Sequence, residues 1–599
     1  MSHFPLLVLL TASLTACASS RTVDVAPAGE TSSAALDTSE ARRVFEGNID
    51  AIHKRDRDRY LSYYLQSDRL SRNGPGGLET GFEGWSARRD STWPDTLVAR
   101  DLRLVPLMPG VVYGTYHYRV TQNGVTSEGI SERVFVRTPE GWKIGVSTAF
   151  GLPAGASPPP LALVGGTLVN PNAPPVPNAA VVVRNGRIVC AGPRDRCPVP
   201  SGLEVVDVTG AFVTPGLIDA HVHYSQTGWV DGRPDALDVR AEFPYDSVVA
   251  SLQQNPGRFD RAYLCSGVTA VFDVGGYPFT HPMSRAHEMS LTGPHMAAAG
   301  PLLSTIDHWV NLPAIRQFTH MKDDSTVRAA VRATASMGAS AIKVWYLQLP
   351  DSLQRRARPL LMLTGEEAKR AGIPLIVHAT QLATAKDALR AGAKLLVHSV
   401  ETEAIDDEFI ALARASGTIV TPTLTVREGY ADVFLGRSPA DRYPLDCIDA
   451  GTRAKLTRVI PEERRAQAIE RVRSGVWERQ RATSERNLER LVEAGIPIAM
   501  GTDAGNPGTA HGPSIYREME AMQAVGMSAA AVFASSTIIP ARAMGRERDL
   551  GTLEQGKIAD IAVFDADPTA DIANARRVRL VVRGGALYGR AELLPRAAR

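Results

Sequence analysis

Short apolar runs alternate with helical patterns through the middle of the chain, from residue 216 to about residue 545. Eight of these runs have the length and composition of buried strands: LIDAHV, VTAVFDVG, MAAAG, SAIKVW, PLIVHA, KLLVHS, TIVTPT and PIAMGTD. Strands that alternate with helices form a parallel sheet, and eight such units predict an α/β protein with a closed (β/α)8 TIM barrel over residues 216–545. The stretch 427–487 is long, charged and helical, so we expect an excursion there that could act as a lid.

Both flanks of this middle segment carry β-type sequence. Residues 161–215 contain short apolar runs punctuated by Asn-Gly, and residues 546–599 contain similar runs in GTLEQGKIADIAVFDADP and VRLVVRGGALYG. Two β-rich ends around a long α/β middle predict one composite β-sandwich built from both segments. The Gly/Pro-rich stretch 151–160 predicts a linker before it.

Residues 37–150 show a different pattern, a helix followed by long alternating strands. Val44, Ile49 and Ile52 mark the helix, and a Pro-Glu-Gly turn separates two alternating runs near the end of the segment. We therefore expect an independent α+β domain. Around RVFVRTPEGWKIGV the segment resembles the cone-shaped domains of the polyketide-cyclase-like and nuclear-transport-factor-like families. Such domains include enzymes as well as binding and oligomerisation modules, so the sequence leaves open whether the chain forms a homo-oligomer.

The first residues, 1–17, are typical of a targeting segment. Their apolar stretch is far shorter than the ~20 residues that a spanning helix needs. The segment ends in LTAC, which resembles the lipobox of bacterial lipoproteins and implies lipidation of Cys17. With Ala18 next, the resemblance implies sorting to the outer membrane, and an ordinary secretory signal is the alternative. Residues 18–36 then form a disordered tether, and we expect the body of the protein in the periplasm.

Charge and cysteine content bear on the binding partners and the disulfides of the chain. The net charge is +2, from 66 Lys and Arg against 64 Asp and Glu, without a block of like charge, which argues against a nucleic-acid partner. Cys190 and Cys197 could form a disulfide across a turn in the oxidising cell envelope, and the sequence leaves this open. Cys265 and Cys447 are predicted to be buried thiols.

Polar residues interrupt the predicted barrel strands near their ends. His221 and His223 are two residues apart, so in a strand they project side by side on one face. The other interruptions are Lys343 in AIKVW, His378 in IVHA, His398 in LVHS and Asp503 in GTDAG. Barrel chemistry occurs at the C-terminal ends of the strands, which meet at one mouth. Imidazole and carboxylate groups bind zinc, so the pattern predicts a metal site there.

These motifs resemble the amidohydrolase superfamily over about residues 161–590. PGLIDAHVHY and GTDAGNPGTAHG look like its imidazolonepropionase-like and prolidase-like members. The resemblance implies that His221, His223 and Asp503 hold one metal ion and that His378 and His398 hold a second. It implies further that Lys343, carboxylated on its amine, bridges two zinc ions. Some relatives use one metal, and there Lys343 would be only a charge partner.

Catalytic roles follow from the same resemblance. A metal-activated hydroxide would attack the scissile carbonyl, and Asp503 would move the proton to the leaving nitrogen. The catalytic candidates are Asp503, His398, His308 and Tyr346, and the substrate-binding candidates are His308, Tyr346, Arg427 and His511. His308 and Tyr346 could donate to the substrate carbonyl, and Arg427 could hold a substrate carboxylate. The alternative for His308, Tyr346, Arg427 and His511 is a loop residue bonded only to backbone.

The chain is therefore predicted to be a metal-dependent hydrolase that cleaves an amide-type C–N bond of a small molecule. A dipeptide or an N-acyl amino acid comes first among the substrates. The alternatives are hydrolysis of a cyclic amide, a lactone or a phosphotriester, and a non-catalytic envelope lipoprotein that binds a ligand. Ligand-type residues at several strand ends argue against the last alternative, because a barrel that only binds has no need of them.

Overall fold

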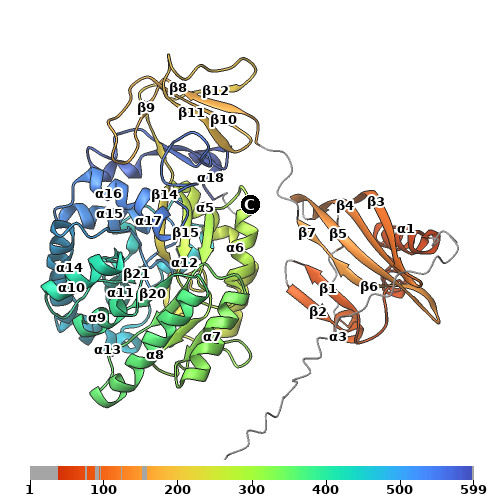
Figure 1. Cartoon of the computed structure of the whole chain (residues 1–599), viewed down its shortest axis with the longest axis horizontal. Coiled ribbons are helices and arrows are strands. Elements are labelled where there is room, and N and C mark those ends of the chain that lie inside the picture. The colour runs from red at the N-terminus through yellow and green to blue at the C-terminus, as the bar shows by residue number, and fades with distance from the viewer. Residues whose placement is uncertain are drawn as a thin grey trace, which may run out of the picture. The chain divides into compact units, whose positions relative to one another are not determined.

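The computed structural model describes residues 38–595, apart from 75–76, 88–92, 95, 123–124 and 152–157. The predicted signal segment with Cys17, the tether and most of the linker 151–160 lie outside the described residues. The chain divides into two compact units, one ending at Phe150 and one beginning at Gly151, with residues 127–129 assigned to the second (Figure 1). Among the described residues no helix is both long and apolar enough to cross a membrane.

In the smaller unit a helix packs on a largely antiparallel sheet, whose strand order is β2-β1-β6-β5-β4-β3 with β7 beside β5. Its strands are β1 (Ser71–Gly74), β2 (Gly77–Thr80), β3 (Thr96–Met108), β4 (Val111–Gln122), β5 (Val125–Thr138), β6 (Gly141–Thr148) and β7 (Phe150–Gly151), and its helices are α1 (Ser39–His53), α2 (Arg57–Ser62) and α3 (Phe82–Ser86). Helix α1 buries Val44, Phe45 and Ile49 against Phe135 and Ile144 of the sheet. The likeness of this α+β unit to the cone-shaped families stays a prediction.

In the larger unit both ends of the segment meet in one sheet. The strands concerned are β8 (Leu161–Val164), β9 (Thr167–Leu168), β10 (Ala179–Arg184), β11 (Arg187–Pro193), β12 (Glu204–Asp207), β13 (Phe212–Pro215), β23 (Ile561–Phe564), β24 (Val578–Arg583) and β25 (Ala586–Gly589). They form two sheets, β11-β10-β8-β12 and β25-β24-β23-β13-β9. Strand β13 pairs antiparallel with β23, and apolar side chains from both ends of the unit share one core.

The parallel strands form two further sheets, β14-β15-β16 and β18-β17-β19-β20-β21-β22. They are β14 (Leu217–Val222), β15 (Val268–Asp273), β16 (His295–Ala298), β17 (Leu302–Ser304), β18 (Phe318–His320), β19 (Ile342–Trp345), β20 (Leu375–His378), β21 (Leu395–Val397) and β22 (Ile419–Thr421). The run predicted as the last barrel strand forms isolated parallel bridges instead, from Ile498 to β22 and from Ala504 to β14. Strands β17 and β18 were not among the predicted strands, and full closure of the barrel stays a prediction.

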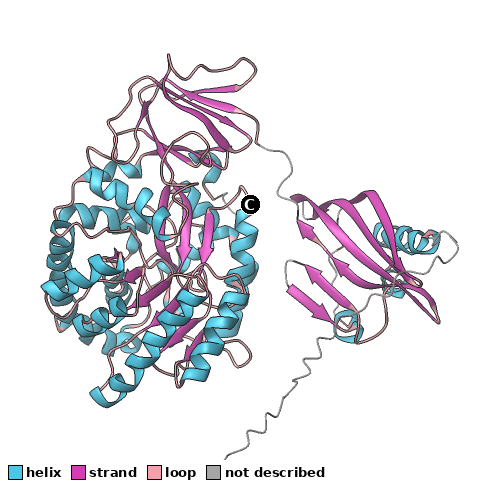
Figure 2. Cartoon of the chain, in the orientation of Figure 1, coloured by secondary structure: helices cyan, strands magenta, loops and turns pink. Residues whose placement is uncertain are grey.

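Helices lie around these parallel strands in Figure 2. They are α4 (Tyr245–Gln254), α5 (Gly257–Cys265), α6 (Thr280–Glu288), α7 (Asp324–Ser336), α8 (Asp351–Arg370), α9 (Leu382–Arg390), α10 (Asp407–Ser416), α11 (Val426–Leu435), α12 (Ala450–Leu456), α13 (Glu462–Arg473), α14 (Val476–Glu493), α15 (Ser514–Ala524), α16 (Ala529–Ser535), α17 (Ile538–Ala543) and α18 (Arg590–Leu593). Helices α11 to α14 occupy the stretch that the sequence marks as a helical excursion.

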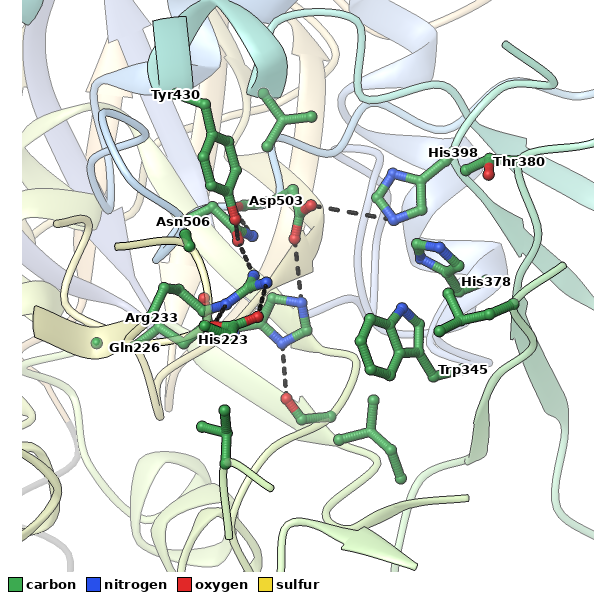
Figure 3. Close-up of a pocket in the computed structure, with 18 of the residues that line it drawn as sticks. His223, Gln226, Arg233, Trp345, His378, Thr380, His398, Tyr430, Asp503 and Asn506 are labelled. Carbon is green, nitrogen blue, oxygen red and sulfur yellow. Dashed lines mark hydrogen bonds and ion pairs between the residues drawn. The ribbon is translucent and has the colours of Figure 1, made fainter. Parts of the chain in front are cut away.

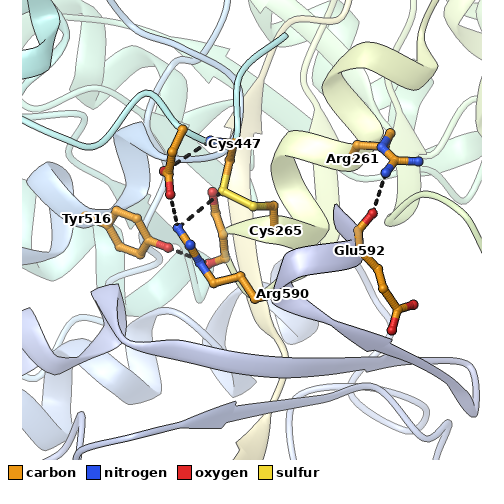
Figure 4. The surroundings of a disulfide bond; sticks show 8 residues. Arg261, Cys265, Cys447, Tyr516, Arg590 and Glu592 are labelled. Atoms are coloured by element: carbon orange, nitrogen blue, oxygen red, sulfur yellow. Dashed lines mark hydrogen bonds and ion pairs between the residues drawn. A yellow bond between two sulfur atoms is a disulfide. The ribbon is translucent and has the colours of Figure 1, made fainter. Parts of the chain in front are cut away.

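The prediction that Cys265 and Cys447 are thiols is wrong. The two residues form a disulfide with a Cα–Cα distance of 5.8 Å, which lies in the usual range for such bonds (Figure 4). They are 182 residues apart, so nothing local in the sequence indicates that the end of α5 meets the loop before α12. Arg590 lies beside this bond and pairs with Asp446 at 2.7 Å. A second disulfide joins Cys190 and Cys197, which the sequence left open.

Replacing Cys447 with serine is expected to lower the free energy of unfolding of the larger unit by about 3–5 kcal/mol, because the bond closes a long loop in the unfolded chain. Thermal unfolding with and without reductant measures the effect. Cys190→Ser is the matched control and should cost less, since its loop spans 7 residues. Alkylation of Cys265 and Cys447 in the folded, unreduced protein would contradict the assignment.

Candidate active site

The polar residues that interrupt the strands line one cavity of about 430 Å³ in the larger unit. They come from the ends of four parallel strands and from the run that bridges β22 to β14: His221, His223, Lys343, His378, His398 and Asp503. Imidazole rings follow one another across the site, with centroids 5.0 Å apart for His221 and His398 and 4.4 Å apart for His398 and His378. Figure 3 shows His378 and His398 side by side. The structure thus brings together all six residues that the sequence predicts as metal ligands.

The carboxylate of Asp503 lies among the histidines. Its Oδ1 is 3.2 Å from Nε2 of His221 and 3.1 Å from Nε2 of His223, and its Oδ2 is 4.0 Å from Nε2 of His398 (Figure 3). Ligand atoms of His221, His398 and Asp503 all lie within 4.8 Å of one another. This is the spacing at which three side chains can share one cation.

Several of these buried atoms lack hydrogen bonds. Neither ring nitrogen of His221, which is 1% exposed, has a hydrogen-bond partner among the described residues, and Oδ1 of Asp503 has none either. Buried polar atoms without partners cost about 1–3 kcal/mol each. A divalent cation between the imidazoles and the carboxylate would remove this cost, so the residues present fit a metal ion.

Hydrogen bonds behind the ligands fix how they point. Nδ1 of His223 donates to the carbonyl oxygen of Gly275 at 2.6 Å, which leaves Nε2 facing the cavity. Nδ1 of His398 is bonded to the hydroxyl of Thr423, also at 2.6 Å. This pattern of one bonded ring nitrogen and one free ring nitrogen is what metal-binding histidines show.

Three buried carboxylates hold the backbone that carries the ligands. They accept hydrogen bonds from main-chain amides of candidate ligands, of residues next to them, or of the turns that hold their rings: Asp219 from His221 (3.2 Å) and Thr502 (3.0 Å), Asp273 from Tyr224 (2.7 Å) and Gly275 (3.1 Å), and Glu518 from Leu424 (2.8 Å) and Thr425 (3.0 Å). Burial raises the pKa of Asp219 to about 7, that of Asp273 to about 6 and that of Glu518 to about 7.

The charge states in the site follow from burial. Burial lowers the pKa of His221 to about 4 and holds the pKa values of His378 and His398 well below their usual range, so these three imidazoles are neutral at pH 7. Burial alone would raise the pKa of Asp503, but His221 and His223 outweigh it and keep that pKa well below the usual value. Burial also lowers the pKa of Lys343 to about 7. Neutral imidazole and ionised carboxylate are the forms that bind metal.

Two ligand residues adopt left-handed backbone conformations. The φ angle is +72° at His398 and +61° at Asp503, and it is +47° at Thr423, which bonds to His398. Such angles are uncommon outside glycine and cost of order 1–3 kcal/mol each. The surrounding hydrogen bonds therefore hold the ligands in positions that the local backbone would not choose.

His308 lines the cavity, as the sequence predicts. Its Nδ1 accepts a hydrogen bond from the backbone amide of Val310 at 3.1 Å, and burial lowers its pKa. The proton of the neutral ring therefore sits on Nε2, which can donate to a bound carbonyl. Arg427 lines the cavity too, but its guanidinium is already bonded through two nitrogens to the carboxylate of Glu401.

The structure does not place Tyr346 or His511 in the cavity. Side chains alternate along a strand, so Lys343 and Trp345 face the cavity, whereas the hydroxyl of Tyr346 lies 3.4 Å from Asp387. His511 is bonded to the hydroxyl of Tyr263 at 2.9 Å and donates to the carbonyl oxygen of Gln226 at 3.0 Å. The position predicted for Tyr346 is thus taken by Trp345, and His511 supports the loop after β14.

A polar network that lies across the site from His378 and His398 in Figure 3 was not predicted. Arg233 pairs with Asp235 through two nitrogens, at 2.9 and 2.8 Å, and also donates to the side chain of Asn506 (Figure 3). The hydroxyl of Tyr430 donates to the same oxygen of Asn506 at 2.7 Å. These residues come from loops and from α11, where no strand or helix period singles them out in the sequence.

The sequence of the larger unit is similar to that of known enzymes. The sequence model of the amidohydrolase family matches residues 212–587. Imidazolonepropionase of Caulobacter vibrioides (strain NA1000 / CB15N) is 25% identical over 425 residues, which cover 66% of this chain and 90% of the relative. The enzyme of the same name from Shouchella clausii (strain KSM-K16) is 41% identical over 85 residues, 14% of this chain and 19% of that relative.

Solved structures share the fold. A Xaa-Pro dipeptidase with bound methionine is 22% identical, with a TM-score of 0.55 over 72% of this chain and 100% of its own. The ochratoxinase of A. niger is 21% identical, with a TM-score of 0.54 over 72% of this chain and 96% of its own. The larger unit therefore has the mixed α/β fold of TIM-barrel type found in these enzymes. Since the family match spans more than half of the sequence, from β13 into β25, the chain belongs to the amidohydrolase family.

Proposed function

We propose that the chain is a metal-dependent hydrolase that cleaves an amide-type C–N bond, with a dipeptide or an N-acyl amino acid as substrate. One observation carries the proposal. Five histidines, Lys343 and the carboxylate of Asp503 line one cavity, and the buried ligand-type atoms of His221 and Asp503 have no hydrogen-bond partners among the described residues. A cavity of about 430 Å³ is large enough for a small molecule of this class.

In this proposal His221, His223 and Asp503 hold one zinc ion, and His378 and His398 hold a second. Lys343, as a carbamate formed from its neutral amine and carbon dioxide with release of a proton, would add anionic oxygen ligands for the metal. Bound metal would polarise the scissile carbonyl and lower the pKa of a water molecule to about 7. The carboxylate of Asp503 accepts the proton that the attacking water loses and passes it to the leaving nitrogen. Nε2–H of His308 donates to the oxygen of the substrate carbonyl.

The names of relatives and charged residues of the cavity support the substrate class. A Xaa-Pro dipeptidase with bound methionine shares the fold, which favours a dipeptide. Among the cations of the cavity lining, Arg233 and Arg427 are paired with Asp235 and Glu401, whereas Arg471 forms no ion pair among the described residues and suits the carboxylate of a dipeptide. The alternative, hydrolysis of a cyclic amide, is favoured by the similarity to imidazolonepropionases. Lactones and phosphotriesters are the remaining substrates to test.

We also propose a lipid anchor at Cys17 in the outer membrane, with both units in the periplasm. The LTAC motif supports it, and so do the two disulfides of the larger unit, because disulfides persist in oxidising compartments.

A hydrolysis screen combined with metal analysis tests the function. Purified protein is expected to contain about two zinc-type ions per chain and to release amino acids from members of a library of dipeptides and N-acyl amino acids. Removing the metal with a chelator should abolish turnover, and adding zinc should restore it. A metal-free preparation that is fully active would refute the proposal, and turnover confined to cyclic amides, lactones or phosphotriesters would select an alternative.

Lys343→Ala is expected to lose bound metal and roughly a thousandfold of turnover, because loss of metal coordination removes several kcal/mol of transition-state stabilisation. Short carboxylic acids should restore part of both by occupying the vacated bridge. Lys343→Arg should also fail, since a guanidinium cannot be carboxylated and adds a fixed positive charge. Lys369→Ala on α8, which is exposed, is the matched control. A Lys343→Ala variant that keeps its full metal content would rule out the bridge and favour the one-metal site.

Cys17→Ser is expected to abolish lipid labelling and to release the protein from the membrane fraction, because the thiol is the only acceptor for the lipid in the lipobox. Metabolic labelling with a fatty acid and fractionation measure both effects. Wild-type protein that is already soluble and unlabelled would contradict the anchor without affecting the hydrolase proposal.

A further inference from the structure

The smaller unit contains a cavity of its own, of about 420 Å³, whose described lining residues all lie between Ile52 and Ala149. Its lining is strongly aromatic and includes Tyr60, Tyr64, Trp85, Trp93, Tyr116 and Tyr118. The ring of Tyr60 is 5.1 Å from that of Tyr64 and 5.7 Å from that of Trp93, both edge to face. Small-molecule sites typically have this size and this apolar character.

A buried arginine lines the same cavity. Arg133, on β5, is 7% exposed. Its Nη1 donates to the hydroxyls of Ser131 at 2.6 Å and Ser147 at 2.7 Å, and its Nη2 donates to the hydroxyl of Tyr116 at 3.0 Å. All of these acceptors are neutral oxygens. No carboxylate of the described residues forms an ion pair with this guanidinium, and its Nε has no hydrogen-bond partner there.

The other charged groups nearby do not neutralise the positive charge of Arg133. Glu132 precedes Arg133 in the strand and so faces the other side of the sheet, where it accepts a hydrogen bond from Tyr113 at 2.6 Å. Two further cations line the cavity: Arg72 is paired with Glu79 at 3.5 Å and lies over the ring of Trp85 at 4.1 Å, and Arg57 donates to the carbonyl oxygen of Ser86 at 2.6 Å. Arg133 therefore gives the cavity a positive charge that nothing described there neutralises. Burying such a charge is costly unless an anion pairs with it.

We propose that this cavity binds a small aromatic carboxylate, whose carboxylate pairs with Arg133 and whose planar body packs among the tyrosine and tryptophan rings. A guanidinium has five N–H donors. Two on Nη1 and one on Nη2 are used by the hydroxyls, so one Nη2 hydrogen is left to donate to a carboxylate oxygen, while the enclosed Nε–H stays without a hydrogen-bond partner. One guanidinium also matches the single charge of a carboxylate. The proposal does not depend on the hydrolase proposal, because its residues all lie in the smaller unit.

The test compares an acid with its neutral amide. Isothermal titration of the full chain with 2-naphthoate and 2-naphthamide, which share one aromatic body, should show the acid binding at least about tenfold tighter, the value of one charge-assisted hydrogen bond. Arg133→Met should bind the two equally. Arg137→Met, an exposed position on the same strand, should keep the preference. Any binding to metal in the larger unit is common to all three proteins.

Wild-type protein that does not bind 2-naphthoate, or that binds acid and amide alike, would overturn the proposal. So would an Arg133→Met variant that keeps the preference, since Arg133 would then only cross-link strands. If Arg133→Met does not unfold cooperatively, Ala149→Phe decides the matter. This substitution fills the cavity and leaves the arginine in place, so it should remove the binding of both probes. Unchanged binding to that variant would also overturn the proposal.

Discussion

Buried carboxylates hold the candidate active site in place. Strand ends have main-chain amides that no neighbouring strand accepts, and a buried amide without an acceptor costs about 1–3 kcal/mol. Asp219, which is fully buried, accepts hydrogen bonds from the main-chain amides of His221 and Thr502. It thereby connects β14 to the run that ends in Asp503. Asp273 and Glu518 do the same for the turns that follow β14, β15 and β22. The ligands depend on these three side chains for their positions, although none of the three is itself in the cavity lining.

That the candidate ligands gather in one cavity could be predicted, because each of them breaks an apolar run. His221, His398 and Asp503 stand out as polar residues at the ends of otherwise hydrophobic runs, and parallel strands bring such ends together. The mistake at Tyr346 has a simple cause, since the two-residue period of β19 already assigns Trp345 to the cavity side. His511 shares a glycine-rich loop with Asp503, and a loop has no period that could show which way its side chains point.

Other features depend on long-range packing and have no local signal. The Cys265–Cys447 disulfide joins residues 182 positions apart, and Arg233 reaches Asn506 across 273 positions. The eighth predicted strand has the apolar character of a strand. Its backbone, however, is left-handed at Asp503, and it forms only isolated bridges. In the smaller unit the alternating pattern predicts strands, yet it does not show that β1 runs parallel to β6.

Chemistry and recognition are divided between different parts of the larger unit. The strand ends supply the candidate ligands, whereas α11, α13 and α14 supply Val426, Arg471 and Trp477 to the lining of the same cavity. Changes in these helices can alter which molecule fits without disturbing the ligands, as is general for enzymes of this architecture.

The sheet that combines β13 with β23 constrains the order of events during synthesis. The hydroxyl of Thr214 on β13 donates to the carbonyl oxygen of Ala562 on β23, 348 residues later, so β13 leaves the ribosome long before its partner exists. Until then its apolar residues, Val213 among them, have no completed core to enter. A chain that is cut short before β23 would leave the edge of β13 unpaired and open to aggregation.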